Sequence, residues 1–165
     1  MKQYKSYQYR IYPNKQQIVL LNKTFGCCRF VFNHLLNVWD EAYQATGKGL
    51  SRSQCSALLP IMKQKEETNW LKEVDSIALQ SSVEYLSDAF HRFFTKQTEK
   101  PRFKSKKNPV QSYTTKYTNG NIVVGETQIK LPKLGMVRYA NSRMIKGRIV
   151  KATLRRNPSG KYFIA

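Results

Sequence analysis

A short basic segment that contains one aromatic residue has the composition expected of a phosphate-binding segment. It reads Pro101-Arg102-Phe103-Lys104-Ser105-Lys106-Lys107. Clustered cations bind phosphates by releasing counterions, and an aromatic ring can stack on a base or a sugar. A solvated linker can have the same composition, but the clustering of the cations favours contact with nucleic acid.

Several polar side chains have groups that can bond to phosphates or base edges. Gln111, Ser112 and Tyr113 supply an amide, a hydroxyl and a ring in an expected strand, although ordinary strand composition explains them equally well. Gln80 lies on an expected helix, and glutamine can bond bidentately to adenine in a major groove. A lone helical glutamine is usually solvated, so this motif is weak by itself.

The sequence does not have the residue groupings of a catalytic or metal centre. His34 and His91 lie on separate expected helices, and the three cysteines Cys27, Cys28 and Cys55 have no metal-ligand spacing. The carboxylates occur in pairs that are typical of solvated helix faces rather than of a two-metal nuclease site. We therefore predict no catalytic residue, no metal and no cofactor, and we expect the cysteines to be buried thiols in a reducing compartment.

The charge of the chain is large and unevenly distributed. The net charge is +19, and residues 101–165 hold fifteen Lys and Arg side chains but a single acidic one, Glu126. A field of this sign attracts polyanions, so nucleic acid is the expected partner and should lie along the C-terminal part. The sequence has no long apolar span and no signal peptide, so we expect a cytoplasmic protein that does not bind membranes.

Helical periodicity dominates the first hundred residues. Residues 2–12 are expected to form a strand that ends at Pro13, followed by two helical stretches on either side of Gly26. Ser51 or Ser53 can cap a shorter helix. A strong apolar stripe then predicts a helix that is capped by Asp75 or Ser76 and carries Leu79, Val83, Leu86, Phe90 and Phe93.

The periodicity changes to two after Pro101. Apolar and β-branched residues alternate with Gly and Asn at the corners, as in Asn119-Gly120-Asn121 and Asn157-Pro158-Ser159-Gly160. This pattern predicts a sheet over residues 101–165. Together with the helices it indicates an α+β fold.

An ordered series of short motifs extends over the whole chain. The motifs are Arg10-Ile11-Tyr12-Pro13, Phe25-Gly26-Cys27-Cys28-Arg29-Phe30-Val31-Phe32-Asn33, Trp70-Leu71-Lys72-Glu73-Val74, Leu79-Gln80, Ala89-Phe90, Phe93-Phe94, Pro101 to Lys106, Gln111-Ser112-Tyr113, Ile129-Lys130-Leu131-Pro132-Lys133-Leu134-Gly135 and Gly160-Lys161-Tyr162. This series resembles the motifs of the TnpB family, also called OrfB, of transposon-encoded RNA-guided DNA endonucleases, and the number of motifs in the same order makes the resemblance specific.

The resemblance implies an oligonucleotide-binding-like β-barrel, called the wedge domain, with an inserted α-helical recognition bundle. Residues 1–12 would supply the first strand of the barrel and residues 101–165 its remainder. Residues 13–100 would form the bundle, which is helix-turn-helix-like. The two parts would hold a guide RNA and a double-stranded DNA with a short adjacent motif.

The resemblance also implies roles for particular side chains. Protein groups would read the brief duplex motif, while RNA pairing would read the longer target. The residues that match the motif-reading positions of the family are Ser76, Gln80, Gln111, Ser112 and Tyr113. The cations expected to contact RNA or DNA backbones are Arg10, Arg29, Arg102, Lys104, Lys106 and Lys107.

The nuclease domain and the four-cysteine zinc element of the family have no counterpart in this sequence. We therefore expect binding without cleavage, and the apolar ending at Phe163 and Ile164 leads us to expect that the chain ends early. Three alternatives stay open: a regulator that occupies transposon ends or promoters, one half of a split nuclease whose other half is a separate chain, and a decayed reading frame.

Overall fold

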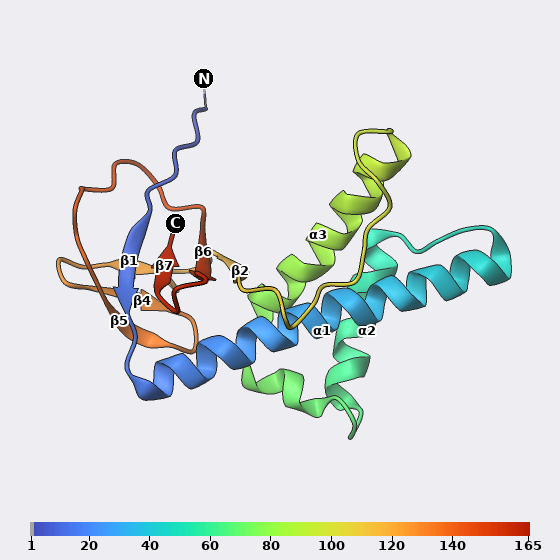
Figure 1. Ribbon diagram of the computed structural model, residues 1–165, viewed down its shortest axis with the longest axis horizontal. Helices are drawn as coiled ribbons and strands as arrows, with labels where there is room; N and C mark the ends of the chain where they lie inside the picture. Colours follow the sequence, from blue (N-terminus) through green and yellow to red (C-terminus); the bar gives the residue numbers. More distant parts are fainter. Residues whose placement is uncertain (1) are drawn as a thin grey trace. The chain divides into compact units, whose positions relative to one another are not determined.

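The structure is a computed structural model that describes residues 2–165 (Figure 1). Its helices precede all of its strands except the first, as the change from helical to alternating periodicity predicts. The helices are α1 Lys15–Thr46, α2 Arg52–Gln64, the 3-10 helix η1 Asn69–Glu73 and α3 Ser76–Phe94. The strands are β1 Tyr9–Tyr12, β2 Gln111–Lys116, β3 Val123–Val124, β4 Gln128–Leu131, β5 Gly135–Tyr139, β6 Lys151–Arg156 and β7 Tyr162–Ile164. The predicted α+β class is confirmed.

The chain divides into two compact units. One consists of the residues up to Phe25 together with Pro109–Ala165 and contains the sheet; the other is Gly26–Asn108 and contains most of the helical residues. Helix α1 contributes its first residues to the sheet unit and the rest to the helical unit. The assignment of the two parts to a wedge domain and a recognition bundle stays a prediction.

The seven strands form one antiparallel sheet in the order β2-β6-β7-β1-β5-β4-β3. Strand β1, from the N-terminal part of the chain, lies between β7 and β5, which follow more than a hundred residues later. Within residues 2–165 the hydrogen-bonded order ends at β2 and β3, so the sheet is open rather than a closed barrel. Figure 1 shows β1 beside β5 and β7.

Residues that alternate along the strands build the core of the sheet unit. Tyr9 and Ile11 of β1 are buried, as are their neighbours Tyr139 and Ile164 on the adjacent strands. Side chains two residues apart share a face of a strand, so this face holds the core and the alternate residues occupy the other face. The first turns of α1 add apolar side chains, among them Leu21 and Phe25, to the same core.

Two expectations about the N-terminal part were wrong. Residues 15–46 form one continuous helix through Gly26, because the buried side chains on both sides of the glycine offset its cost of about 1 kcal/mol relative to alanine. The expected strand over residues 2–12 is limited to Tyr9–Tyr12, because these four residues are the ones that pair with β5 and β7.

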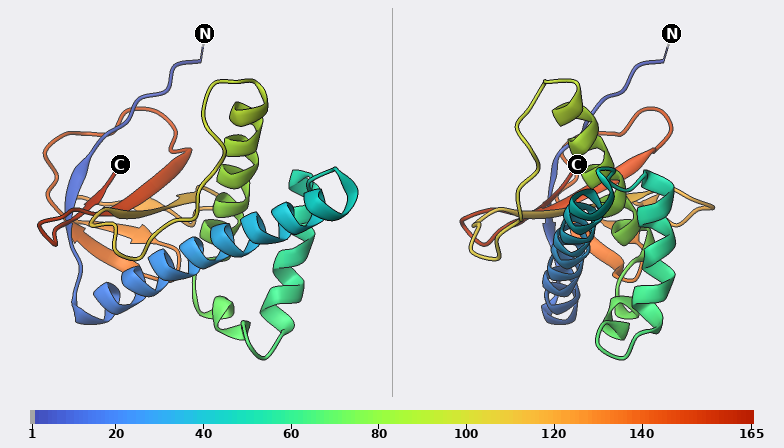
Figure 2. Two further views of the ribbon diagram at one scale, coloured as in Figure 1. Left: turned by 45° about the vertical axis from the view of Figure 1, so that its right-hand side comes forward. Right: turned by 90° about the vertical axis from the view of Figure 1, so that its right-hand side faces the viewer.

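Local capping determines where the two shorter helices begin. Ser51 and Gln54 form a capping box at the start of α2, which tolerates Pro60 in its interior. Asp75 caps α3 by accepting a hydrogen bond of 2.9 Å from the backbone N–H of Ile77. Figure 2 shows α2 and α3 from two further directions. Both expected helices are confirmed. Of the two candidate caps predicted for each helix, Ser51 caps α2 and Asp75 caps α3.

The central position of β1 makes its buried side chains important for stability. Ile11 is 2% exposed, so Ile11→Ala should lower the free energy of unfolding by about 2–5 kcal/mol through the cavity that it leaves. Met136→Ala on the neighbouring β5, where the side chain is 47% exposed, should change it by about 0.5 kcal/mol or less. Urea unfolding followed by circular dichroism measures both, and equal losses would contradict the assignment of β1 to the core.

Candidate nucleic-acid interface

A row of four side chains crosses the sheet on the face opposite its core. Strand pairing places Ser112 of β2 opposite Arg155 of β6, Arg155 opposite Phe163 of β7, and Phe163 opposite Arg10 of β1. Directly paired residues lie on the same face of a sheet, so these four form one continuous line, here called the outer row. Ser112 and Arg155 are exposed, and Phe163 and Arg10 are half-buried.

The outer row combines the groups that single-stranded nucleic acid requires. Two guanidinium groups flank an aromatic ring, and a hydroxyl lies at one end. Guanidinium groups bond to phosphates and an aromatic ring offers a stacking surface for a base. The sheet unit around the row holds sixteen Lys and Arg side chains and one carboxylate side chain, that of Glu126. The net positive charge of this unit therefore attracts a polyanion.

Arg10 is held in place without using all of its donors. Its guanidinium carbon lies 4.9 Å from the ring centroid of Tyr12, two residues along the same strand face. Its Nε is buried and has no hydrogen-bond partner within residues 2–165. A buried donor without a partner is costly. Because this Nε is buried, a phosphate at the outer row would contact the other nitrogens of the Arg10 guanidinium.

A polar network on the core face joins strands β6 and β7 to α1. Arg156 donates to the side-chain oxygen of Asn22, and its guanidinium lies 5.9 Å from the Phe25 ring. Asn22 also bonds to the hydroxyl of Tyr162 over 3.1 Å. The network makes Arg156 a structural residue, whereas its neighbour Arg155 points to the opposite face.

The three consecutive residues predicted to read DNA are divided between the two faces of β2. Gln111 and Tyr113 are buried on the core face, where the Tyr113 ring lies 5.5 Å from that of Phe25. Ser112 belongs to the outer row. The roles of all three in binding stay predictions, and Ser112 is the one that the fold exposes.

The basic segment after α3 contacts α1 through Lys104. The Asn33 side chain accepts a hydrogen bond of 2.7 Å from the backbone N–H of Lys104 and donates one of 2.9 Å to its carbonyl oxygen. The Lys104 ammonium lies 4.4 Å from the ring centroid of Phe32, and desolvation in this position lowers the pKa of Lys104 from its ordinary value. Sequence reasoning did not detect this attachment, because two residues seventy positions apart make it.

The other cations of the segment differ in their surroundings. Arg102 forms an exposed ion pair with Glu99, which reduces the charge that it offers to a phosphate. Lys106 and Lys107 are exposed. Arg29 is half-buried on α1, one helical turn before Asn33. Among the cations of this segment, Lys106 and Lys107 are therefore predicted backbone contacts that are exposed and form no ion pair within residues 2–165.

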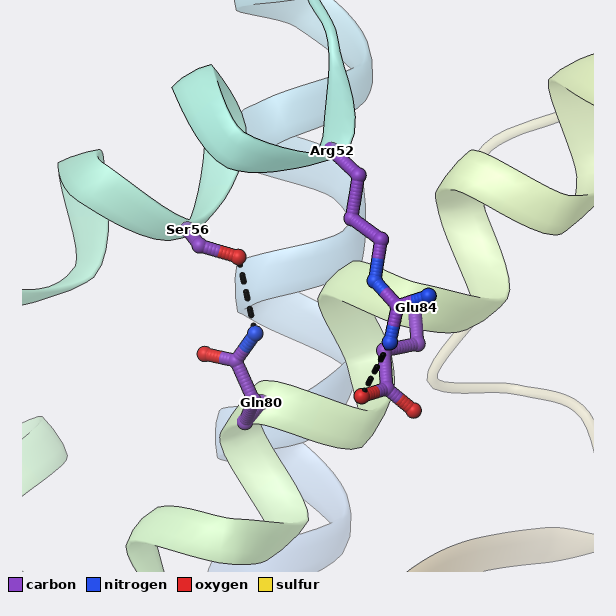
Figure 3. Close-up of polar contacts among 4 residues, drawn as sticks. All are labelled: Arg52, Ser56, Gln80 and Glu84. Atoms are coloured by element: carbon purple, nitrogen blue, oxygen red, sulfur yellow. Dashed lines mark hydrogen bonds and ion pairs between the residues drawn. The ribbon is translucent and has the colours of Figure 1, made fainter.

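Helix α3 places the other two predicted DNA-reading residues on its N-terminal half. Ser76 is the exposed first residue of the helix, directly after the cap at Asp75. The Gln80 amide nitrogen donates to Ser56 of α2 over 2.8 Å, and its oxygen points away from that bond (Figure 3). One turn later, Arg52 of α2 forms a 2.6 Å ion pair with Glu84. Gln80 thus braces α2 against α3 and keeps an acceptor available.

The cysteines are buried and do not form part of the candidate interface. Cys27, Cys28 and Cys55 are buried free thiols, as predicted. Burial raises the pKa of Cys28 to about 12, so this cysteine stays protonated at neutral pH. Residues 2–165 contain no group of three or more His, Cys, Asp or Glu side chains that could hold a metal ion. Over the same residues, no helix is both long enough and apolar enough to cross a membrane.

Sequence reasoning missed two members of the outer row. Arg155 was counted only as part of the C-terminal charge, and Phe163 was considered only as part of the apolar ending of the chain. Arg155 and Arg156 are consecutive in a strand, as are Tyr162 and Phe163, so one residue of each pair must point away from the core. The strand register is needed to identify that residue. That register depends on pairing between distant strands, which periodicity does not reveal.

Comparison with known proteins identifies relatives along the whole chain. A helix-turn-helix domain family of OrfB proteins of the IS605 type matches residues 1–48, the segment that includes β1 and α1. The chain is 34% identical over 166 residues to InsQ of Escherichia coli (strain K12), which is assigned as an RNA-guided DNA endonuclease. It is 32% identical over 166 residues to a protein of Streptomyces pristinaespiralis with the same assignment.

These matches differ in how much of each relative they cover. They include 100% and 98% of this chain, but the chain spans only about 40% of the length of either relative. A third relative, the virulence protein VsdF of Salmonella dublin, is 38% identical over 105 residues, which are 58% of this chain and 88% of VsdF.

Proposed function

We propose, from the premise that this chain belongs to the TnpB/OrfB family of transposon-encoded proteins, that it binds a guide RNA and a short duplex DNA motif beside the target. The relatives InsQ and the Streptomyces protein are assigned as RNA-guided DNA endonucleases, which supports nucleic acid as the partner. In this proposal residues 1–165 recognise nucleic acid and do not cleave it. A cytoplasmic location is part of the same proposal.

The outer row is the observation that carries the proposal. Arg10, Phe163 and Arg155 lie side by side on a sheet unit with a single carboxylate side chain, and Ser112 extends the line. In this arrangement the arginines contact successive phosphates while a base stacks on the ring between them. The sheet would serve as the wedge domain, an oligonucleotide-binding-like surface, in its open seven-stranded form.

Helix α3 is the proposed reader of the DNA motif. Its exposed N-terminus at Ser76 and the Gln80 amide lie on the first two turns of the helix, and a helix of this kind fits a major groove. Lys106 and Lys107 would then contact a backbone. Because the Gln80 nitrogen already bonds to Ser56, the oxygen is the group proposed to accept from a base.

A second function, a DNA-binding regulator that occupies transposon ends or promoters, is favoured by one comparison. VsdF is covered over 88% of its length, so a relative composed mainly of this segment exists. The match to a helix-turn-helix family is compatible with autonomous DNA binding. A third proposal is a split enzyme, in which this chain binds a nuclease half that is a separate chain. Sequence-specific DNA binding without RNA would favour the regulator.

Neutralising the outer row should weaken RNA binding in a salt-dependent way. For Arg10→Gln/Arg155→Gln, the slope of log affinity against log salt concentration should decrease by about 0.7 per lost phosphate contact on single-stranded RNA. The charge-matched control Lys65→Gln/Lys72→Gln changes exposed lysines of the helical unit. Fluorescence anisotropy over a salt series measures both, and equal slopes for the two double variants would contradict the interface.

A pair of variants separates base reading by Gln80 from its bracing role. Gln80→Ala removes both the bond to Ser56 and the free oxygen, whereas Ser56→Ala removes only the bond. If Gln80 reads the motif, Gln80→Ala should reduce discrimination between duplex sequences by about 1–3 kcal/mol, and Ser56→Ala should retain it. Competition binding with motif-variant duplexes measures discrimination. Equal effects of the two variants would assign Gln80 a purely structural role.

A further inference from the structure

Four aromatic side chains form a stack within the helical unit, at the C-terminal ends of α1 and α3. The ring centroids of Trp39 and Phe90 are 3.8 Å apart, with an angle of 15° between the ring planes. The centroids of Trp39 and Tyr43 are 5.5 Å apart, with an interplanar angle of 8°. Phe94 continues the stack, 6.3 Å from Phe90 at 24°. Trp39 and Phe90 are buried, but Tyr43 is 47% and Phe94 59% exposed. The stack therefore begins in the core and presents ring surfaces to solvent.

A cavity of about 490 Å³ lies against this stack. Leu86 and Cys55 also line it, and the loop from Gly47 to Ser51 forms part of its wall. The backbone of Gly49 lies directly on the indole, since a Cβ atom there would be 2.0 Å from Trp39. The loop thus contacts the stack, and the cavity is open to solvent on its other side.

The polar groups that line the cavity are cationic or neutral. Lys48, Arg52 and His91 lie among the lining residues with the hydroxyls of Ser51 and Ser87. None of the lining residues is an Asp or a Glu. Arg52 is partly neutralised by its ion pair with Glu84, whereas Lys48 and His91 are exposed. The cavity is therefore complementary to a ligand that combines a flat aromatic ring with a negative charge.

We propose that this cavity is a stacking subsite for one unpaired base of a single-stranded RNA. The base lies on the exposed ring of Phe94 and extends the aromatic stack, while Lys48 and His91 contact its phosphate. Unpaired RNA bases are available for stacking on aromatic side chains, whereas bases inside a duplex are already stacked on each other. The inference rests on the proposed RNA binding but concerns a different unit from the outer row.

The test uses a short single-stranded RNA that contains one 2-aminopurine, whose fluorescence is quenched when it stacks. Anisotropy of an end label on the same RNA reports total binding independently. Wild-type protein should quench 2-aminopurine over the concentration range in which anisotropy rises. Phe94→Ala should abolish most of the quenching and weaken binding about tenfold, and Tyr43→Ala provides a second variant at an exposed position.

The matched control is Tyr85→Ala, which removes a 40% exposed aromatic side chain of α3 outside the cavity. It should leave quenching and affinity unchanged. The chain has two tryptophans, so Trp70→Phe leaves Trp39 as the only one, and its emission should change on RNA binding. Circular dichroism checks that each variant retains its helix content.

Several outcomes would overturn the subsite and leave the proposed function intact. Normal anisotropy with quenching unaffected by Phe94→Ala would show that RNA binds elsewhere. Tighter binding and stronger quenching of the DNA version of the oligonucleotide would refute the assignment to RNA. Self-association that Phe94→Ala removes, with RNA binding unchanged, would identify a second copy of the chain as the occupant. No anisotropy change with wild-type protein would refute the proposed RNA binding itself.

Discussion

The pairing of β1 with β5 and β7 is the interaction on which the sheet depends. Four residues from the N-terminal part of the chain close the gap between two strands from its C-terminal part. Without them, β5 and β7 would each present an unpaired edge, and exposed edges favour pairing with other chains. The same pairing places Arg10 next to Phe163 and so completes the outer row. Stability and the proposed RNA surface therefore share one structural cause.

Helix α1 is the second constraint, because it supplies apolar side chains to both units. Leu21 and Phe25 belong to the core of the sheet unit, and Leu35 and Trp39 to that of the helical unit. The continuity of the helix through Gly26 explains why a residue that usually weakens helices does not end this one. Burial on both sides outweighs a local preference of about 1 kcal/mol.

The sequence predicts the elements that local rules determine. Four members of the expected stripe, Leu79, Val83, Leu86 and Phe90, are buried, because helical spacing is an intrinsic property of the segment. The fifth, Phe93, lies in the last turn of α3 and is only half-buried. The cysteines were likewise predicted to be buried. The length of β1 was not predictable from its alternation, since its ends are determined by the extent of its partner strands.

The candidate site could be predicted less well than the fold. The basic segment was recognisable from its composition, but the attachment of Lys104 to Asn33 joins distant positions and leaves no local pattern. The outer row requires the register of four strands, and the aromatic stack requires the packing of α1 on α3. Gln111 and Tyr113 are adjacent to Ser112 in sequence, yet strand alternation separates them from it in space.

The central claim is that this chain binds a particular RNA rather than polyanions in general. The most direct measurement is to express the whole chain together with its native flanking DNA, purify it, and sequence the RNA that stays bound after a high-salt wash. The account predicts one strongly enriched RNA that maps next to the gene, because specific contacts persist when counterion release no longer contributes much to binding. A random sample of cellular RNA would contradict it and would leave a protein that binds polyanions through charge alone.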